Sequence, residues 1–257
     1  MMPIFFLQRR WLVALSLLAG CFMAMSAHAE NQAPQGITFY VLRVIYMASD
    51  KQGAAITAYN KTSRAYLMQS RMRPQDTATG EVDNTSTGNT VVPFIVTPPL
   101  SRLEPNDNLT LRIRRNGQPL PEDRESVFFV SMKAIPAQTA AVPQGNTAKV
   151  ILTITHNLKV FYRPEGLKKQ AVAEMAPKLR FKREGNRLVA DNPTPYWLTF
   201  SRLKVGSHAL SKAQLRLMVP PFGKQSYALP PGATGKDVVW QLIDEDGWNT
   251  AAEQRAL

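Results

Sequence analysis

Few residues of this 257-residue chain have a type and spacing suited to catalysis. Beyond residue 29 the histidines are His156 and His208, neither of which has the H-x-x-x-H or H-E-x-x-H spacing, and Cys21 is the only cysteine. The sequence contains no hydrolase nucleophile elbow, no Walker loop and no dinucleotide-binding glycine motif. We therefore predict a protein that is not an enzyme and that needs no nucleotide, metal or other cofactor.

Acidic residues are densest in the run Asp244-Glu245-Asp246-Gly247. Carboxylate oxygens in a loop could bind calcium, but this run lacks the D-x-[DN]-x-[DN]-G spacing of the loops that bind it well. The sequence favours an acidic turn, or a partner for a basic side chain.

The N-terminal segment has the features of a secretory signal peptide. Residues 1–29 contain no acidic residue, two arginines precede an apolar run over residues 11–19, and Ala-His-Ala at 27–29 supplies the small residues of a cleavage site. The apolar run is too short to span a bilayer comfortably. We predict cleavage after Ala29, and the alternative is lipoprotein processing at Cys21.

The chain carries an excess of basic residues, with 31 Lys and Arg against 19 Asp and Glu and a formal net charge of +12. An exported protein rarely meets genomic DNA. The charge therefore favours an anionic protein partner, a carboxylate ligand or a charged envelope surface over nucleic acid. A generally solvated basic surface is the alternative.

Alternation of apolar and polar residues is the dominant pattern. It runs through residues 109–114, 128–134, 150–155 and 179–182, and it places one set of side chains in a core and the other in solvent. Only residues 168–175 suggest a short helix, which Pro177 would end. The sequence therefore predicts an all-β fold made of β-sandwiches. Further β-rich runs lie at 36–46, 54–59, 66–72, 91–96, 160–162, 196–200, 215–219 and 238–243.

A domain boundary is predicted at Arg163-Pro-Glu-Gly166, because the strand-like run over residues 148–162 ends there in Pro and Gly. Residues 30–163 and 167–257 each have about the length of a β-sandwich domain of ~100 residues. Polar segments at 77–89 and 136–147 are predicted to be loops.

A series of short segments extends over most of the chain beyond residue 29. Together, and in this order, they resemble the periplasmic pilus (fimbrial) assembly chaperones of the PapD-like family. The resemblance implies two immunoglobulin-like β-sandwich domains in a boomerang arrangement, with a subunit-binding cleft between them. The segments are Leu42-Arg-Val-Ile-Tyr46, Pro93-Phe-Ile-Val-Thr-Pro-Pro-Leu100, Leu120-Pro-Glu-Asp-Arg-Glu-Ser126, Lys159-Val-Phe-Tyr-Arg-Pro164 and Asp191-Asn-Pro-Thr-Pro-Tyr196.

The resemblance implies a function in pilus assembly. Subunits of such pili are immunoglobulin-like sandwiches that lack their final strand, so each exposes an apolar groove and unpaired backbone groups that promote aggregation. A chaperone of this family caps the groove with its own edge strand in the periplasm and delivers the subunit to an outer-membrane usher. Self-association of the free chaperone is left open. The alternative function is an exported immunoglobulin-like adhesion or ligand-binding module whose strands stay in its own core.

The resemblance also assigns residues to the subunit site. Arg43 and Lys159 match the basic pair that anchors the C-terminal carboxylate of the subunit. Val150, Leu152 and Ile154, on one face of the run before Lys159, match the donated strand. Without the resemblance, the alternation would favour side chains of this protein's own core, and either cation would be interpreted as a solvated strand residue.

Three further residues match a charged network that sets the interdomain angle in the family. Glu125 and Arg163 match two of its members, and Glu245 takes the place of the family's aspartate. The segment 136–147 is modest in length and contains no cysteine, which resembles the short-loop branch that serves rod-forming pili. The second domain also lacks the cysteine pair that some members carry.

Overall fold

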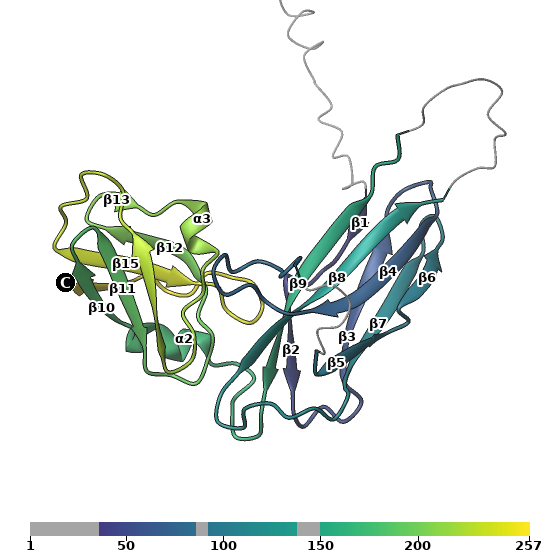
Figure 1. The fold of residues 1–257 in the computed structure, drawn as a ribbon, viewed down its shortest axis with the longest axis horizontal. Coiled ribbons are helices and arrows are strands. Elements are labelled where there is room, and N and C mark those ends of the chain that lie inside the picture. The colour runs from purple at the N-terminus through teal and green to yellow at the C-terminus, as the bar shows by residue number, and fades with distance from the viewer. Residues whose placement is uncertain (1–35, 86–91, 138–149) are drawn as a thin grey trace, which may run out of the picture. The chain divides into compact units, whose positions relative to one another are not determined.

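The computed structural model describes residues 36–85, 92–137 and 150–257. Within these ranges the regular secondary structure consists almost entirely of short strands, as Figure 1 shows. The predicted all-β fold is confirmed, and no helix in these ranges is long and apolar enough to cross a membrane. The predicted signal peptide, with Cys21 and Ala29, lies outside the described residues, as does most of the predicted loop 136–147.

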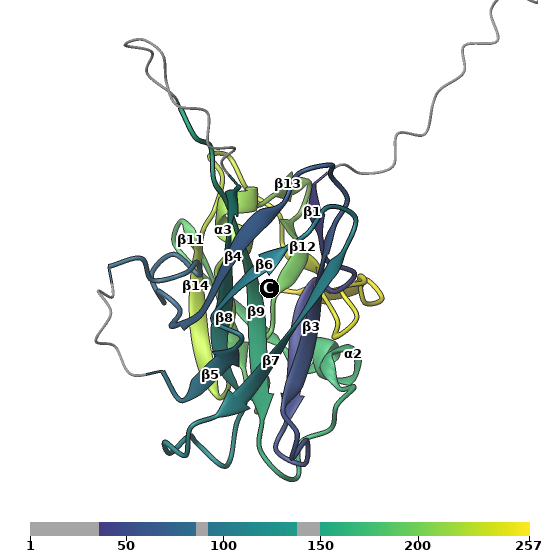
Figure 2. The same ribbon diagram turned by 90° about the vertical axis from the view of Figure 1, so that its right-hand side faces the viewer.

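The first part of the described chain forms a sandwich of two sheets. One sheet has four strands in the order β1-β3-β7-β5, and the other has five in the order β2-β9-β8-β4-β6. β3 and β7 run side by side in Figure 2. The strands are β1 (Ile37–Thr38), β2 (Arg43–Met47), β3 (Ala54–Asn60), β4 (Tyr66–Arg73), β5 (Phe94–Thr97), β6 (Leu100–Leu103), β7 (Asn108–Arg115), β8 (Ser126–Pro136) and β9 (Ile154–Arg163).

The predicted alternation places apolar side chains between these two sheets. In β7, Leu111 and Ile113 are fully buried, whereas Arg114 is exposed on the other face. Met68 of β4 and Met132 of β8 are also fully buried in the same core. Each such side chain contributes roughly 1.5–3 kcal/mol when it leaves water, so the period of two in the sequence is also the main energetic reason for the sandwich.

The second part of the chain forms another sandwich with its own core. Leu188, Tyr227 and Trp240 are among its buried side chains. One sheet has the order β10-β11-β14 and the other β13-β12-β15-β16. The strands are β10 (Arg180–Glu184), β11 (Arg187–Asn192), β12 (Phe200–Val205), β13 (His208–Ala209), β14 (Gly223–Ala228), β15 (Asp237–Leu242) and β16 (Glu253–Ala256).

Two short helices, one between β9 and β10 and the other between β13 and β14, correct two expectations. α2 (Val172–Met175) continues directly into a 3-10 turn (Ala176–Lys178), so Pro177 lies in the first turn of that element and does not end the helical segment. Proline is tolerated there because first-turn N–H groups lack a partner within the helix. The β-rich run at 215–219 is not a strand, because α3 (Lys212–Leu215) ends at its first residue.

β9 begins later than the alternation predicts. The alternation starts at Val150, but the strand starts at Ile154, which pairs with Ala134 of β8. β8 ends at Pro136, so the residues before Ile154 have little of a neighbouring strand to pair with. Val150 and Leu152 therefore lie in the extension that leads into β9.

Candidate functional site

Two cations lie side by side on one face of the five-stranded sheet. β2 and β9 are parallel, and their register pairs Arg43 with Lys159. Arg43 donates a hydrogen bond from Nη1 to the carbonyl of Ile243 at 3.0 Å, and its guanidinium lies 5.3 Å from the centre of the Phe161 ring. Its buried Nε has no hydrogen-bond partner in the part of the chain that the structure describes. The guanidinium is thus held in place by one hydrogen bond and by the ring of Phe161.

Lys159 is the second cation of this pair. Its ammonium group makes no hydrogen bond or ion pair with any other described residue. Burial, and next the charge of Arg43, lower the pKa of Lys159 to about 8. Two neighbouring cations with unused donors favour an anion with two acceptor oxygens, and charge-assisted hydrogen bonds from such a pair suit a carboxylate.

One face of β9 passes from the core into solvent along the strand. Val160 is fully buried and Leu158 packs against the core, whereas Ile154 is 60 % exposed and Leu152, further out, is 79 % exposed. Side chains two residues apart lie on the same face of an extended chain. Val150, at 83 % exposed, continues the series. The interpretation that these side chains fill this protein's own core is therefore wrong for the N-terminal part of the run.

The same part of β9 has an open edge. β8 pairs with β9 from Ile154 to Tyr162, but β2, on the other side, begins its pairing only at Lys159. No other described strand pairs with β9 on that side before Lys159. An edge of this kind presents unpaired N–H and C=O groups to which another chain can add a strand.

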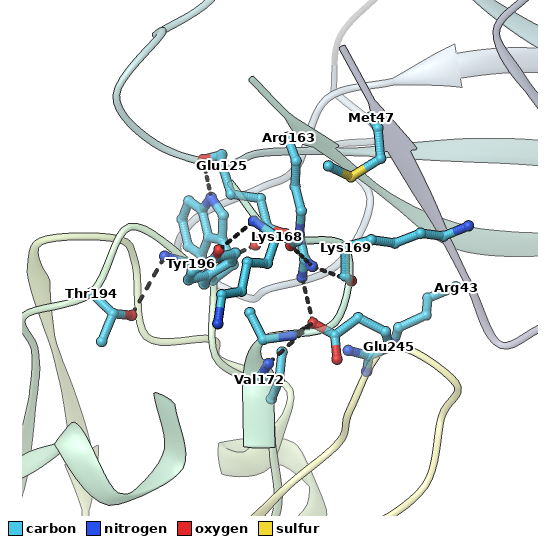
Figure 3. Close-up of polar contacts among 12 residues, drawn as sticks. Arg43, Met47, Glu125, Arg163, Lys168, Lys169, Val172, Thr194, Tyr196 and Glu245 are labelled. Carbon is cyan, nitrogen blue, oxygen red and sulfur yellow. Dashed lines mark hydrogen bonds and ion pairs between the residues drawn. The ribbon is translucent and has the colours of Figure 1, made fainter. Parts of the chain in front are cut away.

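A buried ion-pair network lies next to the cation pair, and Figure 3 shows its members. Arg163 contacts Glu125 at 2.6 Å and Glu245 at 2.8 Å, and all three side chains are almost fully buried. Its Nη1 also donates to the carbonyl oxygens of Lys168 at 2.8 Å and Lys169 at 2.5 Å. The charge and the main donors of the guanidinium are thereby satisfied.

Glu125 is held by residues of the second sandwich. One carboxylate oxygen accepts the backbone N–H of Trp197 at 2.7 Å, and the indole of Trp197 donates to the carbonyl of Glu125 at 3.1 Å. Burial raises the pKa of Glu125 to about 7, while Arg163 and the Trp197 N–H act in the opposite direction. The carboxylate is therefore strongly dependent on these two partners.

The Asn-Pro-Thr-Pro-Tyr segment positions these partners. Asn192 is fully buried, accepts the backbone N–H of Thr194 at 3.0 Å and donates to the carbonyl of Tyr196 at 2.7 Å. The Tyr196 ring lies 4.8 Å from the Arg163 guanidinium carbon, and its hydroxyl accepts the backbone N–H of Lys168 at 2.9 Å. The sequence singled out this segment through the family resemblance alone; its physical role is to present Trp197 and Tyr196 to the network.

Glu245 bonds to the start of α2. Its Oε1 accepts the backbone N–H groups of Ala171 at 2.9 Å and Val172 at 3.1 Å. Asp244, by contrast, shapes the turn itself, because its Oδ1 accepts the N–H of Trp248 at 2.8 Å. Within the described ranges no group of three or more His, Cys, Asp or Glu is placed to hold a metal ion.

A small apolar cluster accompanies the network. Val127, Phe161 and Met218 are buried against one another, with Ile45 and Trp197 packed beside them. Phe161 is the ring beneath the Arg43 guanidinium. The sequence gives no signal for Met218, because its partners come from strands distant in sequence.

Comparison with known proteins identifies the family. Residues 36–168 match the pili and flagellar-assembly chaperone PapD N-terminal domain, and residues 174–254 match the pili assembly chaperone PapD C-terminal domain. The chain belongs to the PapD family of pilus-assembly chaperones. Chaperone protein FimC of Escherichia coli strain K12 is 36 % identical over 237 residues, which are 91 % of this chain and 90 % of FimC.

Solved structures agree with this assignment to the PapD family. The Salmonella enterica SafA pilin in complex with the SafB chaperone gives a TM-score of 0.73 at 29 % identity, covering 88 % of this chain and 98 % of the matched chain. The periplasmic chaperone SfaE gives a TM-score of 0.65 at 33 % identity, covering 86 % of this chain and all of SfaE. This PapD-family protein is a fimbrial chaperone, and the alternative of an adhesion or ligand-binding module is not favoured.

Proposed function

We propose that this chaperone captures pilus subunits in the periplasm, caps each with the open edge of β9, and anchors the subunit's C-terminal carboxylate at Arg43 and Lys159. The observation that supports this proposal is that the exposed side chains, the open strand edge and the two cations follow one another along the direction of β9. The exposed face at Val150, Leu152 and Ile154 leads along an unpaired strand edge to two cations with unused donors. The relative SafB was solved with a pilin, SafA, which supports a pilin as the partner.

The cation pair supplies the anchor. A terminal carboxylate between Arg43 and Lys159 would accept a hydrogen bond from the guanidinium group and another from the ammonium group. It would also relieve the repulsion between the two like charges. Because both groups are largely withdrawn from water, these bonds would be stronger than those of an exposed pair.

The exposed face supplies the donated side chains. Val150, Leu152 and Ile154 are 83 %, 79 % and 60 % exposed, so a subunit groove could remove most of their surface from water. At roughly 25 cal/mol per Å², three aliphatic side chains contribute several kcal/mol. Backbone pairing along the open edge sets the register, because a slip by one residue would turn these side chains away from the groove.

Glu125, Arg163 and Glu245 hold the two sandwiches at the angle that capture requires, in this proposal. Their contacts link β8 and β9 to the start of α2 and to Trp197. We further propose that the two domains are residues 30–163 and 167–257, since β9 ends at Arg163 and α2 begins at Val172.

We propose that subunit capture takes place in the bacterial envelope. The features of residues 1–29 and the relative SfaE, a periplasmic chaperone, support export to the periplasm with cleavage after Ala29. We propose that captured subunits pass from there to an outer-membrane usher, without nucleotide, metal or enzymatic turnover. Pilin and usher reading frames beside this chain's gene would identify the partners, and their co-expressed products would serve as probes.

Shortening one donated side chain tests strand donation. Leu152→Ala is expected to weaken capture of a co-expressed pilin by roughly 60-fold, because about three buried carbon atoms are lost at ~0.8 kcal/mol each. Thr153→Ala, on the opposite face, is the matched control and should leave capture unchanged. Pull-down from periplasm and titration of the purified pair measure both. Equal effects of the two variants would contradict donation of this face.

The anchor should depend on pH in a definite direction. The pKa of Lys159 is lowered to about 8 in the free protein, and a bound carboxylate would raise it. Affinity for the pilin should therefore be constant well below pH 8 and fall by up to about tenfold per pH unit above it. Lys159→Arg should abolish this decline, because arginine stays charged. A Lys159→Arg protein with the same decline would show that another group titrates.

A further inference from the structure

The connection between β4 and β5 contains a compact turn. We name residues 75–83 of it the clasp loop. Gln75 and Val82 form a bridge across its base, and Gly80 donates its N–H to the carbonyl of Asp76 at 2.8 Å. The two carboxylate oxygens of Asp76 accept the N–H of Ala78 and the hydroxyl of Thr79, each at 2.8 Å. These bonds give the loop a defined shape without a sheet to support it.

The clasp loop contacts the second sandwich through Gly80 and Glu81. Gly80 is buried at a φ of +73°, and a Cβ there would lie 2.8 Å from the carbonyl carbon of Arg216 and 3.2 Å from the Cα of Leu217. Only glycine permits this approach of two backbones. Glu81 forms an ion pair with the side chain of Arg216.

The contacted segment leads to the subunit anchor. Two residues after Arg216, the buried Met218 packs against Val127 and Phe161. Phe161 in turn carries the Arg43 guanidinium on its ring at 5.3 Å. The clasp loop, the segment 216–218, Phe161 and Arg43 therefore form one continuous series of contacts, which meets the Arg163 network at Trp197.

We propose that the clasp loop holds the segment 216–218 against the first sandwich and thereby positions Arg43 for subunit capture, with Gly80 as the main positioning residue. The role in capture rests on the function proposed above; the effect on Arg43 does not. Glu81 and Arg216 are more than half exposed, so their ion pair sets the register of the contact and contributes less to its strength.

Gly80→Ala tests the proposal in the free protein. Spin labels at Lys61→Cys and Ser207→Cys, in a Cys21→Ser background, report the distance between the two sandwiches. Because the added methyl group meets backbone atoms, the distance distribution should broaden. The pKa of Lys159, followed by NMR of its side-chain methylene group, should rise, since a displaced Arg43 no longer lowers it. Gly117→Ala is the matched control: Gly117 has a similar φ of +87° but nothing within 4 Å of the added carbon.

A charge exchange tests the pairing itself. Glu81→Arg and Arg216→Glu should each broaden the distance distribution, and the protein with both changes should recover most of the original one. Failure of the exchange to recover it would remove Glu81 and Arg216 from the proposal. If Gly80→Ala behaves like Gly117→Ala in both measurements, the proposal that the clasp loop positions Arg43 is wrong.

Subunit binding separates this proposal from the function on which it rests. Gly80→Ala should lower the affinity for a co-expressed pilin by roughly threefold to tenfold, because only molecules with Arg43 in place anchor the carboxylate. If Arg43→Ala leaves binding unchanged, the proposed anchor fails, yet the two measurements on the free protein still decide whether the clasp loop positions Arg43.

Discussion

A protein with both Arg43→Ala and Lys159→Ala is expected to lose affinity for its pilin by roughly 1,000-fold, since each lost partner of a desolvated charge pair typically costs 2–5 kcal/mol. Arg43 and Lys159 are paired in the register of two neighbouring strands, and each has hydrogen-bond donors without a partner among the described residues. Neither contributes a described contact on which the core of the first sandwich depends. The fold should therefore persist, and circular dichroism together with titration of the purified pilin measures both quantities.

Lys133 provides the control for this experiment. It lies on β8 in the same sheet and pairs with Thr155, away from the proposed anchor. Lys133→Ala should change affinity by less than threefold, as expected for a partly exposed cation. The most direct check is on the ligand: a pilin extended by one residue, which moves its carboxylate, should bind the wild-type chaperone poorly. Retention of full binding by the double variant would refute the anchor.

Arg163→Met is expected to lower the free energy of unfolding by about 3–5 kcal/mol, because it leaves two carboxylates buried without their cation. Glu125 and Glu245 both contact Arg163 and have almost no exposed surface. Urea denaturation followed by fluorescence of the tryptophans measures the change. Lys168→Met removes an ion pair with Glu174 in which both side chains are more than half exposed, and it should cost under about 1 kcal/mol.

The loss in Arg163→Met should also depend on pH. Burial already raises the pKa of Glu125 from 4.5 to about 7, and removal of Arg163 takes away the main influence that lowers it. A folded-state pKa above the unfolded value means that the folded protein takes up protons as the pH falls. The variant should therefore be least stable above pH 7 and regain stability as the pH falls toward 4.5. Replacing both glutamates with glutamine should recover most of the loss at pH 8; no recovery would contradict the assignment to unpaired carboxylates.

Local pattern was sufficient for the fold class. The alternation through residues 109–114 predicted a strand with Leu111 and Ile113 inward, and both are fully buried in β7. That inference works because side chains alternate between the faces of any strand, whatever the strand packs against. The glycine of the clasp loop, in contrast, was only part of a polar segment, since the close approach to Arg216 belongs to no pattern in the chain.

Arg43, Lys159, Glu125, Arg163 and Glu245 were assigned through the family resemblance, and the residue types alone would have suggested solvated charges. Tertiary structure decides their chemistry. The parallel pairing of β2 with β9 brings Arg43 beside Lys159, and the first turn of α2 gives Glu245 its backbone donors. It also decides which edge of β9 stays open, because β2 starts only at Arg43 and pairs with β9 only from Lys159. Alternation determines on which side of a strand a residue lies. The burial, ion pairs and pKa of a side chain depend on the residues that contact it, and tertiary structure brings those residues together from distant parts of the chain.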